Sequence, residues 1–270
     1  MVSESDKVFV GSIPDVYDAY LVPLIFEQYA VDLADRAAAL RATAILEVAA
    51  GSGVVARAVA PALGAHASHV VTDLNPPMLE RAASMQQNPT RIEWRPADAH
   101  DLPFPGATFD LVLCQFGAMF FPDRVKAYSE ARRVLQPGGR FIFSMWDRIE
   151  ENDFAHEVTG ALATVFPDDP PRFLVRTPHG HHDPATYRAE LGAAGFDEVG
   201  IEAVDAVSVA SDPVIPAIAY CQGTPLRNEI EARYPPSLED ATVQVADAIR
   251  ERFGDDDVHG RIRGYVITAG

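Results

Sequence analysis

Short apolar runs alternate with longer amphipathic stretches over most of this 270-residue chain. The runs have the length of buried strands, and the longer stretches have helical periodicity. Parallel strands need helical crossovers between them, and those helices cover both faces of the sheet. The alternation therefore predicts an α/β fold built on a mostly parallel sheet.

Seven segments are predicted to form strands. They are residues 44–49, 69–73, 92–97, 109–115, 140–146, 199–209 and 261–269. Helices are predicted over 54–63, 76–87, 123–135 and 184–194. Asn75 and Asp183 suit helix N-caps, because each precedes a proline at the first helical position. Gly195 suits the left-handed conformation that ends many helices.

The composition excludes several classes of protein. There are 22 basic and 39 acidic residues, so the net charge of −17 repels phosphate backbones and anionic lipid, and no nucleic acid partner is expected. No segment approaches the roughly 18 apolar residues of a membrane span, and the first residues do not resemble a secretion signal. Cys114 and Cys221 lie far apart and form no metal or disulfide motif, which favours a cytoplasmic location.

Small residues follow the first predicted strand, in the sequence EVAAGSGVVA over residues 47–56. They let the backbone approach a ligand closely, and the helix that follows offers unpaired N–H groups to a carboxylate or phosphate. The same residues also suit a tight turn without a ligand. Gly51, Gly53 and Ala56 match the dinucleotide fingerprint, and Asp73 stands where a ribose-binding acid is expected, so NAD is one candidate ligand.

Further segments resemble class I S-adenosylmethionine-dependent methyltransferases, and the resemblance is greatest to the ubiquinone/menaquinone-biosynthesis type, called type 11. Residues 45–53 (ILEVAAGSG) are similar to the first motif of this family, with Ala49 in place of its first glycine. The segments DLNPPML (73–79), ADAHDLPF (97–104), FDLV (109–112), LQPGGR (135–140) and GFDEV (195–199) resemble later motifs in the family's order. An NAD site explains the first motif only. The resemblance implies a Rossmann-like sheet of seven strands, mostly parallel, with helices on both faces and an antiparallel last strand.

The resemblance also implies S-adenosylmethionine as cofactor and assigns residues to the ends of the strands. Glu47 is expected near the amino acid end of the cofactor, where it accepts from the ammonium group or steadies the glycine loop. Ala49, Gly51 and Gly53 are expected to pass beneath the cofactor, and Asp73 to bind both ribose hydroxyls.

The adenine is expected to lie against Leu74 and Met78, of which Met78 also suits an ordinary helix core. Asp98 is expected to accept from its exocyclic amine, and the Ala99 backbone N–H to reach a ring nitrogen. An alternative role of Asp98 is to cap its own turn.

Other candidates lie near the predicted acceptor. Gln115 and Phe116 follow the fourth strand and face the crevice at the carboxyl ends of the strands, where they are expected among the cofactor-binding residues, Gln115 with its amide on the cofactor or the acceptor. The candidates for the acceptor pocket are Tyr17, Tyr20, Met119, Trp146 and His156. The histidine-rich stretch 179–183 invites a metal site, but no metal is predicted, because neighbouring histidines on a loop seldom reach one ion.

The expected activity is methyl transfer to a small, partly hydrophobic acceptor by in-line attack, with catalysis mainly from positioning. No catalytic residue is demanded, because the thioether leaving group needs no proton. An NAD(P)-dependent oxidoreductase and a non-catalytic cofactor-binding module remain alternatives. The acceptor, the atom that is methylated and the oligomeric state are not indicated by the sequence.

The whole chain is predicted to be a single domain. The cofactor-binding core covers residues 44–147, after a helical cap at 1–43. A lid insertion is expected at 148–183, and the end of the sheet at 184–270 with a helical insertion at 212–252 that Pro216, Pro225 and the pair Pro235-Pro236 interrupt.

Overall fold

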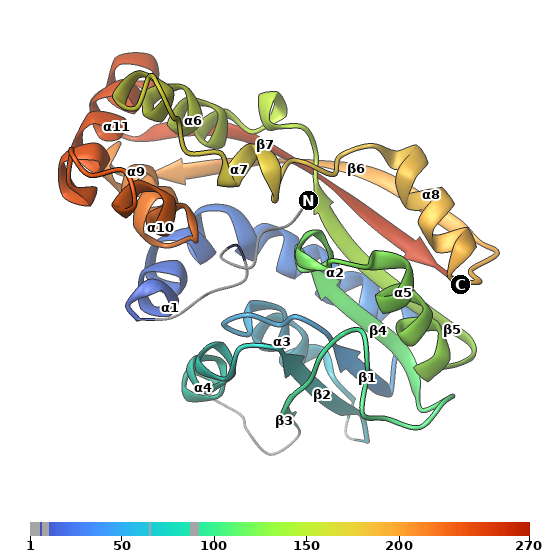
Figure 1. Ribbon diagram of the computed structural model, residues 1–270. Helices are drawn as coiled ribbons and strands as arrows, with labels where there is room; N and C mark the ends of the chain where they lie inside the picture. Colours follow the sequence, from blue (N-terminus) through green and yellow to red (C-terminus); the bar gives the residue numbers. More distant parts are fainter. Residues whose placement is uncertain (1–5, 7–10, 65, 87–91) are drawn as a thin grey trace. The chain divides into compact units, whose positions relative to one another are not determined.

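The computed structural model describes residue 6 and residues 11–64, 66–86 and 92–270 (Figure 1). The chain divides into two compact units, each assembled from separate stretches of sequence. The helical unit comprises Met1–Phe26, Trp146–His182 and Val204–Gly264. The sheet unit comprises Glu27–Met145, Asp183–Ala203 and Tyr265–Gly270.

One seven-stranded sheet has the strand order β3-β2-β1-β4-β5-β7-β6. The strands are β1 (Ala44–Glu47), β2 (Ser68–Asp73), β3 (Ile92–Pro96), β4 (Phe109–Gln115), β5 (Leu135–Trp146), β6 (Val199–Ala210) and β7 (Val258–Ala269). β1 pairs in parallel with β2 and β4, and β2–β3 and β4–β5 are parallel as well. The last strands are antiparallel, which confirms the predicted fold class.

The register of β1 is fixed at its first residues. The Asp110 carboxylate on β4 accepts hydrogen bonds from the backbone N–H groups of Thr43, at 2.8 Å, and Ala44, at 3.1 Å. Ile45 then lies opposite His69 of β2. This register makes Glu47 the last residue of β1, at the edge where the carboxyl ends of β2 and β4 also lie.

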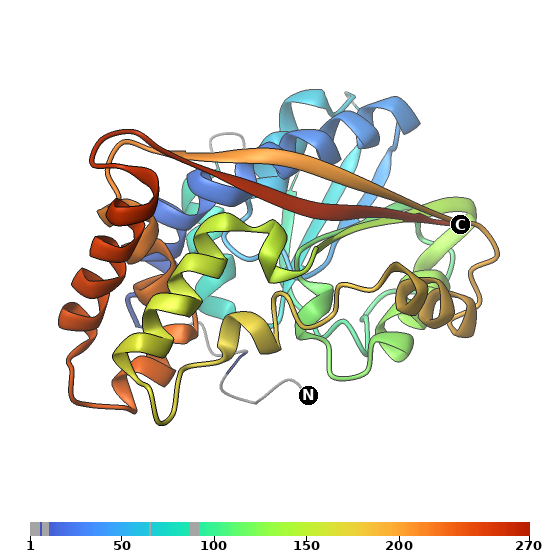
Figure 2. The ribbon, with the colours of Figure 1, turned by 90° about the horizontal axis from the view of Figure 1, so that it is seen from above.

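The helices of the sheet unit lie on both faces of the sheet. They are α2 (Glu27–Leu40), α3 (Val54–Val59), η3 (Ala60–Ala62), α4 (Pro76–Met85), η5 (Ala118–Phe120), α5 (Arg124–Val134) and α8 (Pro184–Ala193). α2 packs on α3 and α5 packs on α8, and Figure 2 shows these two pairs on opposite sides of the strands. Asp183 caps α8 as predicted, and Gly195 has the predicted left-handed conformation.

The helical unit contains most of the remaining helices. They are α1 (Ile13–Val16), the π-helical η2 (Tyr17–Phe26), η6 (Ile149–Glu151), α6 (Asp153–Val165), α7 (Phe173–Arg176), α9 (Val214–Gln222), α10 (Leu226–Glu231) and α11 (Leu238–Phe253). α11 packs against α6 and α9, and α9 packs against η2.

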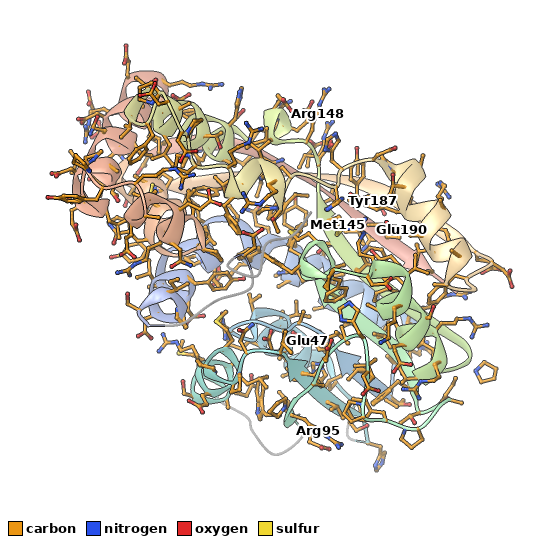
Figure 3. All side chains as sticks on the ribbon, in the orientation of Figure 1. Glu47, Arg95, Met145, Arg148, Tyr187 and Glu190 are labelled. Carbon is orange, nitrogen blue, oxygen red and sulfur yellow. The ribbon has the colours of Figure 1, made fainter. Side chains whose placement is uncertain are left out.

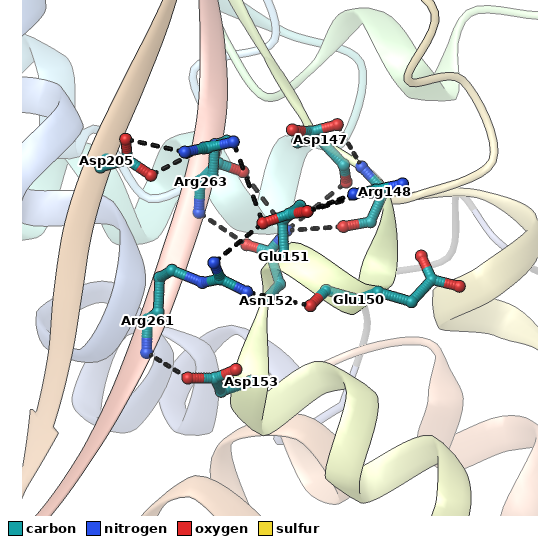
Figure 4. A network of polar contacts seen from close by, with 9 residues as sticks. All are labelled: Asp147, Arg148, Glu150, Glu151, Asn152, Asp153, Asp205, Arg261 and Arg263. Carbon is teal, nitrogen blue, oxygen red and sulfur yellow. Dashed lines mark hydrogen bonds and ion pairs between the residues drawn. The ribbon is translucent and has the colours of Figure 1, made fainter.

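A polar network fixes the start of α6 to β7 within this unit (Figure 4). The Asn152 side chain accepts from the Arg263 backbone N–H at 3.1 Å and donates to the Arg263 carbonyl oxygen at 3.3 Å. The Glu151 carboxylate lies 2.6 Å from the guanidinium of Arg148 and 3.0 Å from that of Arg261. Asn152 thus satisfies backbone groups of a strand much as a neighbouring strand would.

Several predicted elements differ in detail, among them the strand predicted over 44–49, which ends at Glu47. Pro216 does not interrupt a helix but lies in the first turn of α9, where no intrahelical bond needs its missing N–H. β7 begins at Val258, before the predicted residue 261. β5 begins at Leu135 and not at residue 140, because Leu135 pairs with Phe109 before a bulge shifts the register. The predicted end of the helix at residue 87 lies outside the described residues.

Candidate active site

The bend after β1 turns through three left-handed residues. The φ angles are 54° at Ala49, 57° at Gly51 and 78° at Gly53. A Cβ at Gly53 would lie 2.8 Å from the Cβ of Ala82 on α4, so this position accepts only glycine without rearrangement. Ala49 occupies the place of the family's first glycine, and its left-handed φ gives the physical reason for a glycine there.

Asp73 ends β2 and holds this bend. One carboxylate oxygen accepts the Gly51 N–H at 2.8 Å, and the other accepts the Asn75 N–H at 2.7 Å. Burial raises the pKa of Asp73, although these backbone hydrogen bonds oppose the shift. The Asn75 side-chain amide also donates to the oxygen that accepts the Asn75 N–H, at 3.4 Å, so Asp73 orients both the bend and the residues that follow β2.

Glu47 ends β1 (Figure 3). Its exposed fraction is 1%. Its Oε2 lies 3.2 Å from Nε2 of His69, which is also buried, but the contact does not have the geometry of a hydrogen bond. Among the described residues, no hydrogen bond reaches either Glu47 oxygen or the buried Ser52 hydroxyl in the bend. Buried acceptors without partners cost stability, and they gather here beside the bend.

Asp98 lies in the loop after β3 and has one occupied carboxylate oxygen. Its Oδ1 accepts from the His100 backbone N–H at 2.9 Å and lies 2.7 Å from Nδ1 of the His100 ring. Ala99 is buried, and Leu74 beyond the end of β2 is 54% exposed. Met78 is buried within α4.

The ends of β1 and β4 approach each other closely. A Cβ at Gly117 would lie 2.5 Å from the Cβ of Ala49, so only glycine allows this approach. Phe116 before it has a left-handed φ of 48°, and its ring meets that of Tyr29 edge-on at 4.9 Å. Gln115 is half-buried as the last residue of β4. The predicted residues at these two strand ends are therefore neighbours.

Comparison with known proteins identifies the family. Residues 46–143 match a family described as a methyltransferase domain. The chain is 30% identical over 168 residues to the ubiquinone/menaquinone biosynthesis C-methyltransferase of Ralstonia pickettii, a match that covers 57% of this chain and 68% of that protein. The chain belongs to the class I S-adenosylmethionine-dependent methyltransferases.

Solved structures support the fold of this methyltransferase. The YcgJ protein of Bacillus subtilis superimposes with a TM-score of 0.58 at 19% identity, covering 90% of this chain and 97% of that one. Phosphoethanolamine N-methyltransferase 2 of Haemonchus contortus, solved with phosphomonomethylethanolamine and S-adenosylhomocysteine, gives a TM-score of 0.50 at 17% identity, covering 84% and 48%.

The predicted pocket residues of the methyltransferase fall in both units. Met119 belongs to the sheet unit and is buried, whereas Tyr17, Tyr20, Trp146 and His156 belong to the helical unit. Tyr17 stacks on Phe26 at 5.2 Å between ring centroids, and Phe26 lies 6.0 Å from Trp146. His156 is an exposed residue of α6.

Sequence analysis missed the role of His179 in the helical unit. It is buried, and its Nδ1 lies 2.8 Å from the Asp147 carbonyl oxygen, so Nδ1 is the donor. Burial lowers the pKa of His179 to about 4, which leaves the ring neutral at pH 7. In the described part of the chain, no group of three histidine, cysteine or acidic residues is arranged to hold a metal ion.

Two other structural features lie apart from these residues. A pocket of about 350 Å³ at the amino end of β1 is lined by residues of α2, of the α3–η3 segment and of the turns before β1 and β2, and it contains none of the predicted site residues. No helix of the described ranges combines the length and apolar composition that crossing a bilayer requires.

Proposed function

We propose that the protein binds S-adenosylmethionine at the carboxyl ends of β1–β4 and transfers its methyl group to a small, partly hydrophobic acceptor. The observation that carries this proposal is the bend held by Asp73 beside buried oxygens of Glu47 and Ser52 that lack hydrogen bonds from described residues. Free thiols at Cys114 and Cys221 favour a reducing, cytoplasmic setting.

The chemistry of the donor set fits the cofactor. The Glu47 carboxylate suits an ammonium group, which would supply the missing donors. The Asp73 carboxylate suits two vicinal hydroxyls. Oδ2 of Asp98 suits an exocyclic amine, because the bonds from His100 reach only Oδ1. Gly51 and Gly53 supply the left-handed backbone of the bend.

When bound, the cofactor supplies a methyl group on a positively charged sulfur. The chain's own residues then have to bind, orient and exclude water, so that an acceptor atom approaches in line at roughly 3–3.5 Å. Because these tasks are binding, orientation and the exclusion of water, no side chain is assigned a catalytic role. Tyr17, Tyr20, Met119, Trp146 and His156 remain the proposed acceptor residues.

Titration calorimetry with S-adenosylhomocysteine tests the proposal in the Asp73→Ala variant. Loss of a charge-assisted pair weakens binding by about 1–3 kcal/mol, or roughly 5- to 150-fold. Asp73→Asn is the matched control, since its side-chain oxygen still accepts one backbone N–H. NADH is titrated in parallel and is expected not to bind.

Three results would contradict the proposal. Unchanged S-adenosylhomocysteine binding by Asp73→Ala would remove Asp73 from the site. Binding of NADH in preference to S-adenosylhomocysteine would favour an oxidoreductase. Binding of the cofactor without methylation of any phenolic, enolic or amine acceptor would favour a non-catalytic module.

A further inference from the structure

His100 is bonded twice to one oxygen of Asp98. The backbone N–H of His100 donates to Oδ1 at 2.9 Å, which is the ordinary closure of an Asx turn. The ring adds a second bond to the same oxygen, at 2.7 Å from Nδ1. A turn needs only the first bond, so the ring contact is additional to what the loop conformation requires.

The direction of the ring bond follows from the charge on Asp98. Partial burial raises the pKa of Asp98, but the hydrogen bonds from His100 and the nearby charges of His100 and Lys126 outweigh it, and the pKa is lowered. An ionised carboxylate only accepts hydrogen bonds, so Nδ1 is the donor. Both donors therefore converge on Oδ1, and they hold the carboxylate plane in one orientation.

The His100 ring is itself held in place. It meets the Phe121 ring edge-on, with centroids 5.7 Å apart and an angle of 72° between the planes. Its Nε2 is buried and has no hydrogen-bond partner among the residues that the structure describes. The His100 ring therefore contacts both Phe121 and Asp98. It holds an Asp98 side chain that is itself 51% exposed.

We infer that His100 is a positioning residue for purine recognition: it fixes Oδ1 of Asp98 so that Oδ2 faces a 6-amino group and disfavours a 6-oxo group. The inference rests on the proposed function, in which Asp98 binds the adenine amine. A freely rotating carboxylate on an exposed loop would discriminate less, because it loses rotamer freedom on binding.

The experiment compares two ligands that differ at one purine position. S-adenosylhomocysteine carries a 6-amino group and S-inosylhomocysteine carries a 6-oxo group. Their dissociation constants are measured by calorimetry for the wild-type protein and for His100→Phe, His100→Asn and Asp98→Ala. Phe keeps a ring beside Phe121 but has no donor, whereas the Asn amide nitrogen replaces Nδ1 as donor.

The expected result is a loss of preference in His100→Phe and in Asp98→Ala, but not in His100→Asn. In His100→Phe the affinity for S-adenosylhomocysteine falls roughly tenfold, the affinity for S-inosylhomocysteine changes less than about twofold, and His100→Asn keeps a preference near the wild-type value. An equal loss for both ligands, or the same loss in Phe and Asn variants, would overturn the inference in favour of a packing role.

The Asp98→Ala variant distinguishes the positioning role of His100 from the proposed adenine contact of Asp98. If it loses the preference while His100→Phe retains it, the inference about His100 is wrong and the adenine site stands. If Asp98→Ala binds both ligands as the wild type does, the proposed adenine contact is wrong, and the role of His100 is lost with it.

Discussion

The helical unit and the sheet unit differ in whether their buried polar side chains have hydrogen-bond partners. In the helical unit, Asn152 bonds both backbone groups of Arg263, and His179 donates to the Asp147 carbonyl oxygen. At the end of β1 in the sheet unit, Glu47 has buried oxygens to which no described residue donates.

This difference separates two uses of polarity. Buried polar groups that have hydrogen-bond partners rigidify a fold. Buried polar groups without partners cost free energy, and a structure keeps them where another molecule supplies the missing partners. The comparison assigns the polar residues of the helical unit to stability and those at the end of β1 to binding. Four experiments test this assignment.

Replacing Glu47 with Gln is expected to have the largest effect, on binding. The neutral amide loses the charge-assisted bond to an ammonium group, so affinity for S-adenosylhomocysteine falls roughly ten- to a hundredfold. The free energy of unfolding in urea is expected to change little, because no described residue donates a hydrogen bond to the Glu47 oxygens. A destabilised variant with unchanged affinity would place Glu47 with the structural residues.

The pH dependence of stability tests His179. Its pKa is lowered to about 4 in the folded state, below the value of about 6.5 for an unfolded chain, so the unfolded chain binds more protons between these values. The stabilisation is present above pH 6.5 and is lost as the pH falls towards 4, about 2 kcal/mol between pH 7 and pH 5. Urea unfolding at both pH values measures it, with His179→Phe as the control that lacks this contribution. Equal pH dependence in both proteins would contradict the burial of a neutral ring.

Replacing Asn152 with Ala is expected to destabilise the protein without affecting binding. The Arg263 N–H loses its acceptor in a partly buried position, which costs about 1–2 kcal/mol in the free energy of unfolding. The affinity for S-adenosylhomocysteine, measured by calorimetry, is expected not to change. A weakened affinity in a stable variant would contradict the assignment of Asn152 to stability alone.

The smallest expected effect is a gain in stability from Ala49→Gly. A left-handed alanine is strained, but glycine has more conformational entropy in the unfolded chain, so the net gain is about 0.5–1 kcal/mol. Thermal unfolding measures it. A lower melting temperature would mean that the methyl group of Ala49 contributes more by packing than its backbone loses by strain.

Much of the fold was predictable because it depends on local patterns. β4 has the predicted bounds of Phe109–Gln115, since an apolar run is bounded there by polar residues and turn signals. The π-helical segment Tyr17–Phe26 was not predictable in detail, since Pro23 lies inside it and helix propensity alone does not indicate that conformation. The early start of β7 depends on pairing with distant strands, which a local window does not contain.

The candidate site was predictable where the residues of one strand end indicate it by themselves, as with the acidic Asp73 at the end of a predicted strand. The contact between Glu47 and His69 was not, because it depends on the register that sets Ile45 opposite His69. The backbone bond from His100 to Asp98 was predictable, since the two residues have the spacing of an Asx turn. The ring contact was not, because it depends on the rotamer of His100.

The place of β7 in the sheet has a consequence for how the chain is made. β7 is the last strand in the sequence, yet it lies between β5 and β6. During synthesis on the ribosome, both of those strands expose unpaired backbone edges until residues 258–269 emerge. The nascent chain therefore passes through an interval in which β5 lacks its β7 neighbour and can pair with another extended peptide, whereas β6 ends the strand order and keeps an outer edge even after β7 pairs with it.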